Sequence, residues 1–211
     1  MNEIICIGTS YTEGGGLYAP SVKNYYKKQN IRINSDTIYL NHILTYVKEG
    51  RFKGLNNQIL KELGKELKFY PGLPDFFTNI RNAINNNPDY RKFNITVEHY
   101  IVSTGFTEMI RGSVIAPFVE EVWGCEFIEQ PAGSNYSLID ETLEHSDISQ
   151  VAIALDNTTK TRAIFEINKG VNKFENIDVN SKMKNKDRRI PFNHMIYIAD
   201  GPSDIPAFSI I

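Results

Sequence analysis

The sequence predicts an α/β fold with a parallel sheet, and three observations support that prediction. Short apolar runs, typical of buried parallel strands, occupy residues 3–8, 97–103, 123–128 and 195–199. Stretches with helical periodicity separate these runs, and such alternation is typical of a parallel sheet covered by helices. Two of the runs end in polar residues, at the carboxyl ends of strands where open α/β sheets bind their ligands. The predicted fold class therefore also indicates where a site would lie.

Length and charge narrow the class of protein. The chain has 211 residues, of which 41% are hydrophobic, enough for one core domain with a small cap. The net charge of −2 gives no reason to expect nucleic acid or a membrane as partner, and the apolar runs are too short to span a bilayer. Cys6 and Cys125 form neither a metal-type pair nor a disulfide framework. We expect a cytoplasmic protein, and the sequence leaves its oligomeric state open.

The first third of the chain is predicted to be one strand followed by helices. Residues 3–8 form the strand, and a turn with three successive glycines follows at 9–16. Asp36 is predicted as the N-cap of a helix over 37–48. A second helix over 56–68 would carry on one face Leu60, Leu63 and Leu67.

These helices suggest a division of the chain into two parts. We expect residues 17–68 to form a small helical cap, inserted after the first strand and lying over the site. Residues 1–16 and 69–211 would then form the α/β core.

The rest of the chain alternates helices and strands. A break at residues 71–74 precedes a helix over 75–85. The strand over 97–103 leads through a turn at Thr104-Gly105 into a helix over 107–111. The remaining elements are a strand over 123–128, an ambiguous polar stretch over 131–147, a helix over 158–168, a basic loop over 182–189 and a last strand over 195–199.

Three features at the ends of these elements could carry chemistry. A hydroxyl and backbone N–H groups at a strand-to-helix turn, as at Thr104 and Gly105, can bind a phosphate oxygen, although Thr104 could instead only cap a helix. Lys160 at a helix start can neutralise a phosphate, although an exposed surface lysine is the simpler explanation. Asp200 and Asp204 follow the last strand, and two carboxylates there can hold a hard cation.

The order of these features resembles the haloacid dehalogenase (HAD) superfamily of phosphohydrolases. A strand ending in Thr104, a lysine at the start of a helix and a strand followed by Asp-Gly-x-x-Asp occur here in the family's sequence. The flanking residues are similar as well, and the resemblance extends over about residues 36–208. It implies a Rossmann-like HAD core with a parallel sheet and a helical cap inserted after the first strand.

The resemblance also implies a role for each residue. Thr104, with Gly105, would bind the phosphoryl group, and Lys160 would stabilise its charge. Asp200 would bind Mg²⁺, and Asp204 would support that metal directly or through water. The implied ligand is a phosphorylated small molecule, held mostly by positioning and charge neutralisation.

The first motif of this family is degenerate in this chain. The family carries an Asp-x-Asp-x-Thr arrangement at the end of its first strand, and the equivalent positions here are Cys6, Gly8 and Ser10. No Asp occurs before Asp36, so a shifted register does not restore the motif. A glycine cannot protonate a leaving group, and burial at an apolar strand end disfavours a Cys6 thiolate. We therefore expect an impaired phosphatase or a pseudoenzyme.

Other hypotheses remain open from the sequence. The Gly8-Thr9-Ser10 turn also resembles the first block of SGNH hydrolases, in which Ser10 would be an esterase nucleophile. None of the four histidines has an Asp three residues before it, which argues against that family. An active phosphatase with an unusual nucleophile, and a non-catalytic interaction scaffold, are the further alternatives.

Overall fold

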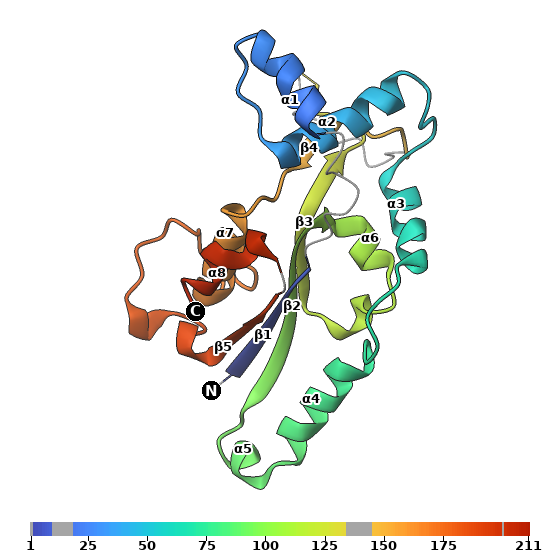
Figure 1. The fold of residues 1–211 in the computed structure, drawn as a ribbon. Coiled ribbons are helices and arrows are strands. Elements are labelled where there is room, and N and C mark those ends of the chain that lie inside the picture. Colours follow the sequence, from blue (N-terminus) through green and yellow to red (C-terminus); the bar gives the residue numbers. More distant parts are fainter. Residues whose placement is uncertain (1, 10–18, 134–144, 200) are drawn as a thin grey trace.

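The chain folds around a five-stranded sheet in the order β4-β3-β2-β1-β5. This computed structural model describes residues 2–9, 19–133, 145–199 and 201–211. The strands are β1 (Asn2–Thr9), β2 (Thr96–Phe106), β3 (Glu121–Ile128), β4 (Gln150–Ile153) and β5 (Met195–Ile198). The long strand β2 runs through the middle of the molecule, with β1 and β5 beside it (Figure 1). The predicted α/β class is confirmed.

Four of the five strands are parallel. β1 pairs with β2 over its whole length, so that Thr9 lies opposite Ser103, and β5 pairs with β1 on the other side. β4 is antiparallel to β3, with Val151 opposite Phe127, so the sheet is mixed rather than wholly parallel. No strand was predicted at β4, because a short apolar run without a clear period does not distinguish strand from helix.

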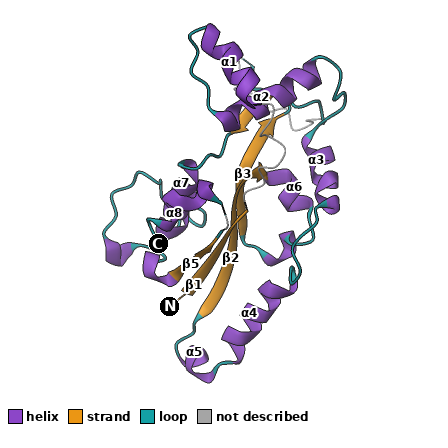
Figure 2. Cartoon of the chain, in the orientation of Figure 1, coloured by secondary structure: helices purple, strands orange, loops and turns teal. Residues whose placement is uncertain are grey.

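Eight α-helices cover the sheet and extend from it within the described residues (Figure 2). They are α1 (Ala19–Lys28), α2 (Ser35–Lys48), α3 (Asn57–Leu63), α4 (Asp75–Asn86), α5 (Pro88–Lys92), α6 (Thr107–Gly112), α7 (Thr159–Lys169) and α8 (Ile205–Phe208). None of these helices is long and apolar enough to cross a bilayer.

Successive residues of β2 enter different apolar clusters, because side chains alternate along a strand. Tyr100 packs with Ile164 and Ile167 of α7 and with Ala207 of α8. Ile101 instead packs with Phe77 of α4 and Ile110 of α6. The two helix pairs therefore cover opposite faces of the sheet.

The start of α2 differs from the prediction. Asn34, in an extended conformation, is the N-cap, and its side chain accepts a hydrogen bond of 2.8 Å from the backbone N–H of Asp36. Asp36 was predicted as the cap, and that was wrong. Asp36 instead lies in the first helical turn, where its carboxylate is not required to hold the helix end.

The helix predicted over 56–68 also ends early, because α3 meets α6 through two glycines. A Cβ atom added to Gly112 would lie 1.7 Å from the Lys61 carbonyl oxygen, and one added to Gly64 would lie 2.0 Å from that of Met109. Leu60 is buried here, but Leu63 is 46% exposed. This contact between backbones cannot be deduced from leucine spacing.

Helices α2 and α3 share an apolar cluster with the sheet. Leu40 and Val47 of α2 and Leu60 of α3 pack in one cluster with Val102 and Phe127. The division of the chain into a core and a cap over 17–68 stays a prediction.

Candidate functional site

The predicted site lies at the edge of the sheet where β1, β2 and β5 end. These strands are parallel, so their carboxyl ends meet at one edge. Thr104 directly follows the last residue of β2 that pairs with β1. Thr104 and Gly105 lie within β2, not in a turn after it as predicted, and the pairing of β2 with β3 shifts register between Val102 and Phe106. The site residue is thus on an irregular stretch of strand.

The centre of this edge is a buried ion pair between Lys160 and Asp204. The Lys160 Nζ lies 2.7 Å from Asp204 Oδ1, and both side chains are fully buried. Lys160 comes from the first turn of α7 and Asp204 from the short turn that follows β5. Two of the residues that the sequence indicated therefore meet in space.

Further hydrogen bonds occupy the Asp204 carboxylate. The Tyr197 hydroxyl donates to Oδ1 at 2.5 Å, and the Ser203 hydroxyl donates to Oδ2 at 3.2 Å. Lys160 also donates to the Ser203 Oγ at 3.2 Å. An ammonium has three N–H donors, and among the described residues two of those of Lys160 have acceptors, Asp204 and Ser203.

Cys125 connects the Thr104 strand with the turn before α7. Its thiol donates to the Thr104 carbonyl at 3.4 Å, and its sulfur accepts the Leu155 N–H at 3.3 Å. Burial raises the pKa of the Cys125 thiol, so a thiolate is disfavoured. The Gly105 N–H is also engaged, because it donates to the Ser103 Oγ at 3.0 Å. Cys125 therefore links elements of the site rather than acting as a nucleophile.

Asp156 organises the turn that precedes Lys160. Its Oδ1 accepts the backbone N–H groups of Thr158 at 2.9 Å and Thr159 at 2.7 Å, as well as the Thr159 hydroxyl. Burial raises the pKa of Asp156, but these hydrogen bonds outweigh it and hold the pKa below its usual value. An ionised Asp156 thus fixes the start of α7.

The N-terminal part of α2, with its cap Asn34, contacts this edge at two points. The Asn34 side chain donates to Asp156 Oδ2 at 3.2 Å, and the Tyr39 hydroxyl lies 3.5 Å from the Thr104 carbonyl oxygen. Asp36 lies between these two contacts in the chain and is half-buried. Burial and the nearby charge of Asp156 raise the pKa of Asp36, while Lys160 and Lys23 oppose the shift.

The other predicted residues are placed less completely. No hydrogen bond in the described ranges joins Thr104 to Lys160. Ser10 and Asp200 lie outside the described residues. Cys6 and Gly8 are described through the backbone of β1, where Cys6 pairs with Tyr100 on one side and Tyr197 on the other. Cys6 is thus three residues before the end of β1, within the sheet rather than at its edge.

Sequence reasoning missed several contributors to the site. Tyr197 reads as an ordinary strand residue, and nothing in the sequence shows that its hydroxyl reaches Asp204. Asp156 was detectable, because an Asp three residues before Thr159 is a typical start of a helix. Cys125 was noted only as an unpaired cysteine.

The described residues do not by themselves suit a Mg²⁺ ion. Both oxygens of Asp204 accept hydrogen bonds, and the carboxylate is neutralised by Lys160. Within the described ranges no three His, Cys, Asp or Glu side chains converge as a metal site. These hydrogen bonds favour an indirect role for Asp204, and the metal assignment of Asp200 and Asp204 stays a prediction.

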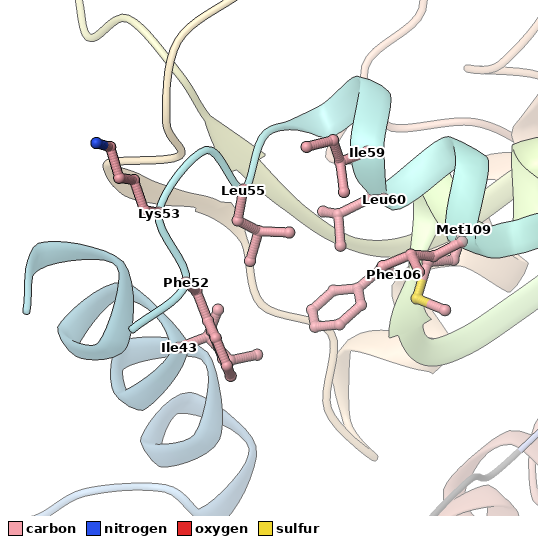
Figure 3. A pocket seen from close by; sticks show the side chains of 9 residues that line it. Ile43, Phe52, Lys53, Leu55, Ile59, Leu60, Phe106 and Met109 are labelled. Atoms are coloured by element: carbon pink, nitrogen blue, oxygen red, sulfur yellow. The ribbon is translucent and has the colours of Figure 1, made fainter. Parts of the chain in front are cut away.

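An apolar pocket of about 370 Å³ lies beside this edge, between α2, α3 and α6. Figure 3 shows its side chains, which are Ile43, Phe52, Lys53, Leu55, Ile59, Leu60, Leu63, Phe106 and Met109. The Lys53 ammonium points away from the other side chains (Figure 3). The Phe106 ring also contacts Tyr39, with ring centroids 5.7 Å apart. The pocket suits an apolar group, not a phosphate.

Comparison with known proteins agrees with the fold. No family model matches the chain. An uncharacterized protein of Borreliella burgdorferi is 46% identical over 180 residues, which cover 85% of this chain and 61% of that protein. The crystal structure of a probable phosphoserine phosphatase from Vibrio cholerae, in its unliganded form, has a TM-score of 0.53 at 11% identity. The match covers 100% of this chain and 54% of the Vibrio chain. The chain thus has an α/β fold similar to that of the Vibrio protein and spans about three fifths of the curated relative.

Proposed function

We propose that this chain is a HAD-like domain that binds the phosphate group of a small molecule at the carboxyl ends of β1, β2 and β5, with little or no phosphatase turnover. One observation supports the proposal above the others. Lys160 and Asp204 form a buried ion pair at this edge, and among the described residues two of the three lysine N–H donors have acceptors.

The phosphate would lie between Lys160 and Thr104. Lys160 would donate its remaining N–H to a phosphate oxygen, and a charge-assisted hydrogen bond of this type is stronger than a neutral one. The Thr104 hydroxyl would donate a second hydrogen bond. Residues 17–68 would act as the cap, because the N-terminal part of α2, with its cap Asn34, contacts both Thr104 and Asp156.

Turnover would be low because the strand that should carry the nucleophile lacks both carboxylates. Gly8 has no group that exchanges a proton, and Cys6 lies three residues inside the strand. Hydrogen bonds that position the phosphate would then support binding without an attacking group. Mg²⁺ would depend on Asp200, with Asp204 acting through water.

Phosphate binding tests the proposal directly. Inorganic phosphate should raise the melting temperature of the protein and give a measurable heat by titration calorimetry. Thr104→Val removes only the hydroxyl and should weaken phosphate binding severalfold. Thr96→Val changes the same strand at its other end and should bind phosphate like the wild type. Absence of phosphate binding, with Mg²⁺ or with EDTA, would show that the proposal is wrong.

Turnover is measured separately with p-nitrophenyl phosphate and Mg²⁺. We expect hydrolysis no faster than in buffer. Hydrolysis that disappears in Asp200→Asn would contradict the claim of low turnover and would support an active phosphatase instead.

A further inference from the structure

Asp36 is a half-buried carboxylate for which no function is yet assigned. It does not cap α2, since Asn34 does so. No hydrogen bond or ion pair to another side chain is found for it among the described residues. A hydrogen bond from its own backbone and the charges of Lys160 and Lys23 lower the pKa of the Asp36 carboxylate, but burial and the charge of Asp156 outweigh them. Carboxylates that carry such a desolvation cost cluster at functional sites.

The contacts of α2 fix the position of Asp36 at the site. Asn34, two residues before it, holds Asp156, and Tyr39, three residues after it, reaches the Thr104 carbonyl oxygen. Residues three apart in a helix share a face, so Asp36 lies on the face of Tyr39. Asp36 is therefore on the side of α2 from which Tyr39 reaches Thr104, and the charges of Asp156 and Lys160 act on its carboxyl group.

Charged groups that act on Asp36 come from α1 and from the start of α7. Asp156 and Lys160 face it from the start of α7, and their charges act on it in opposite senses. Lys23 of α1 is also near, because its Nζ donates to the Ser35 Oγ at 2.9 Å. In the described part of the chain, the charge of Asp36 also raises the pKa of Tyr39 on its own helix and that of the Cys125 thiol of β3.

We propose that Asp36 is the charge gate of the anion site, admitting a phosphate group when its carboxyl is neutral and opposing one when it is ionised. This inference rests on the proposed function. A neutral carboxyl donates a hydrogen bond to an anion, whereas a carboxylate repels it. Burial and Asp156 raise the pKa of Asp36, which brings this change closer to neutral pH.

The charge of Asp36 would also affect which phosphorylated ligands the site prefers. With Asp36 ionised, the site would favour ligands that place a cationic group near their phosphate, because that group would neutralise the carboxylate. With Asp36 neutral, this preference would disappear. Asp36 would thus decide which phosphorylated molecules bind at a given pH.

Sulfate is the probe that isolates the effect, because its charge does not change across the pH range used. Sulfate affinity would be measured by calorimetry between pH 7.5 and pH 4.5 at constant ionic strength, with circular dichroism confirming that the protein stays folded. Because the pKa of Asp36 is raised, the wild type should bind sulfate more tightly as the pH falls. Full protonation of Asp36 should tighten binding by about tenfold, the size expected for removing one nearby charge. Asp36→Asn should bind tightly at both ends.

Two variants serve as controls. Asp36→Glu keeps the charge and should retain the pH dependence. Asp75→Asn changes an exposed carboxylate in the first turn of α4 and should behave as the wild type. If wild type and Asp36→Asn share one pH dependence while Thr104→Val still weakens binding, the gate is wrong and the proposed function stands. If no variant binds sulfate or phosphate at any pH, the proposed function itself fails.

Discussion

Lys160 and Asp204 lie 2.7 Å apart, and neither side chain is exposed to solvent. A buried pair of this kind stabilises little compared with two apolar residues, but removing one partner leaves an uncompensated charge in the interior. The pair is therefore a sensitive point of the fold as well as the centre of the proposed site.

A double-mutant cycle should measure this pair. Lys160→Met and Asp204→Asn should each lower the free energy of unfolding by about 3–5 kcal/mol, and the double variant should lose less than the sum of the two. Arg162→Met breaks an exposed pair with Glu166 on the same helix and should cost under about 1 kcal/mol. Urea unfolding provides the measurement. Additive losses in the double variant would show that the two charges do not interact.

The Tyr197 hydroxyl should contribute separately. Tyr197→Phe removes the hydrogen bond to Asp204 but keeps the ring, and we expect a loss of about 1.5–3 kcal/mol because the acceptor is charged. Tyr70→Phe is the matched control, since Tyr70 is 80% exposed. Equal stability of both variants in chemical unfolding would mean that Tyr197 adds nothing to the pair.

Protonation of His99 should lower the free energy of unfolding in acid. Its ring is fully buried against Phe77, and neither ring nitrogen has a hydrogen-bond partner in the described part of the chain. Burial, together with the positive charge of Arg81, lowers the pKa of His99 from 6.5 to about 4, against the opposing charge of Glu120. The unfolded chain therefore binds the proton first, and stability is lost as the pH falls from 6.5 to 4.

The expected loss from His99 is up to about 3 kcal/mol, since one pKa unit corresponds to about 1.4 kcal/mol. Unfolding free energies at pH 7 and pH 4.5 would be compared for the wild type and His99→Leu. The variant should lose correspondingly less stability in acid. The same acid loss in both proteins would indicate that other groups are responsible.

The contact between α3 and α6 depends on the absence of side chains at two positions. Gly112→Ala places a Cβ against the Lys61 carbonyl and should destabilise the protein by about 1–3 kcal/mol or more. Gly133→Ala meets nothing within 4 Å and should change the stability little. Thermal unfolding of both variants gives the comparison, and an unchanged Gly112→Ala protein would refute the close approach.

Most of the fold could be predicted from local patterns. The strands at 3–8, 97–103, 123–128 and 195–199 were identified because buried strands are continuous apolar runs. The early end of α3 was not predicted. It depends on the close approach of Gly64 to Met109, and these two residues are far apart in the sequence. The cap is Asn34 and not the predicted Asp36. Either residue type can accept the capping hydrogen bond, and only the backbone conformation decides between them.

The site was predictable in part. Lys160 and Asp204 were identified from their places in a motif, and the structure brings them together. The motif did not show that Tyr197 and Ser203 donate hydrogen bonds to the Asp204 carboxylate, since these contacts arise from packing across the end of β5. Nor did it indicate Asp36, whose place at the site depends on how α2 contacts β2 and α7.

The neutralisation of Lys160 by Asp204 has a consequence for selectivity. An anion that reaches this lysine finds a cation whose charge is already balanced, so it gains little from attraction at long range. The interaction that remains is a directional N–H···O hydrogen bond, which is strong only when the oxygen lies at the correct angle and distance. At equal concentration, tetrahedral oxyanions should therefore bind this site far more tightly than chloride does. Added salt should weaken oxyanion binding only modestly, because the balanced pair is shielded from mobile ions.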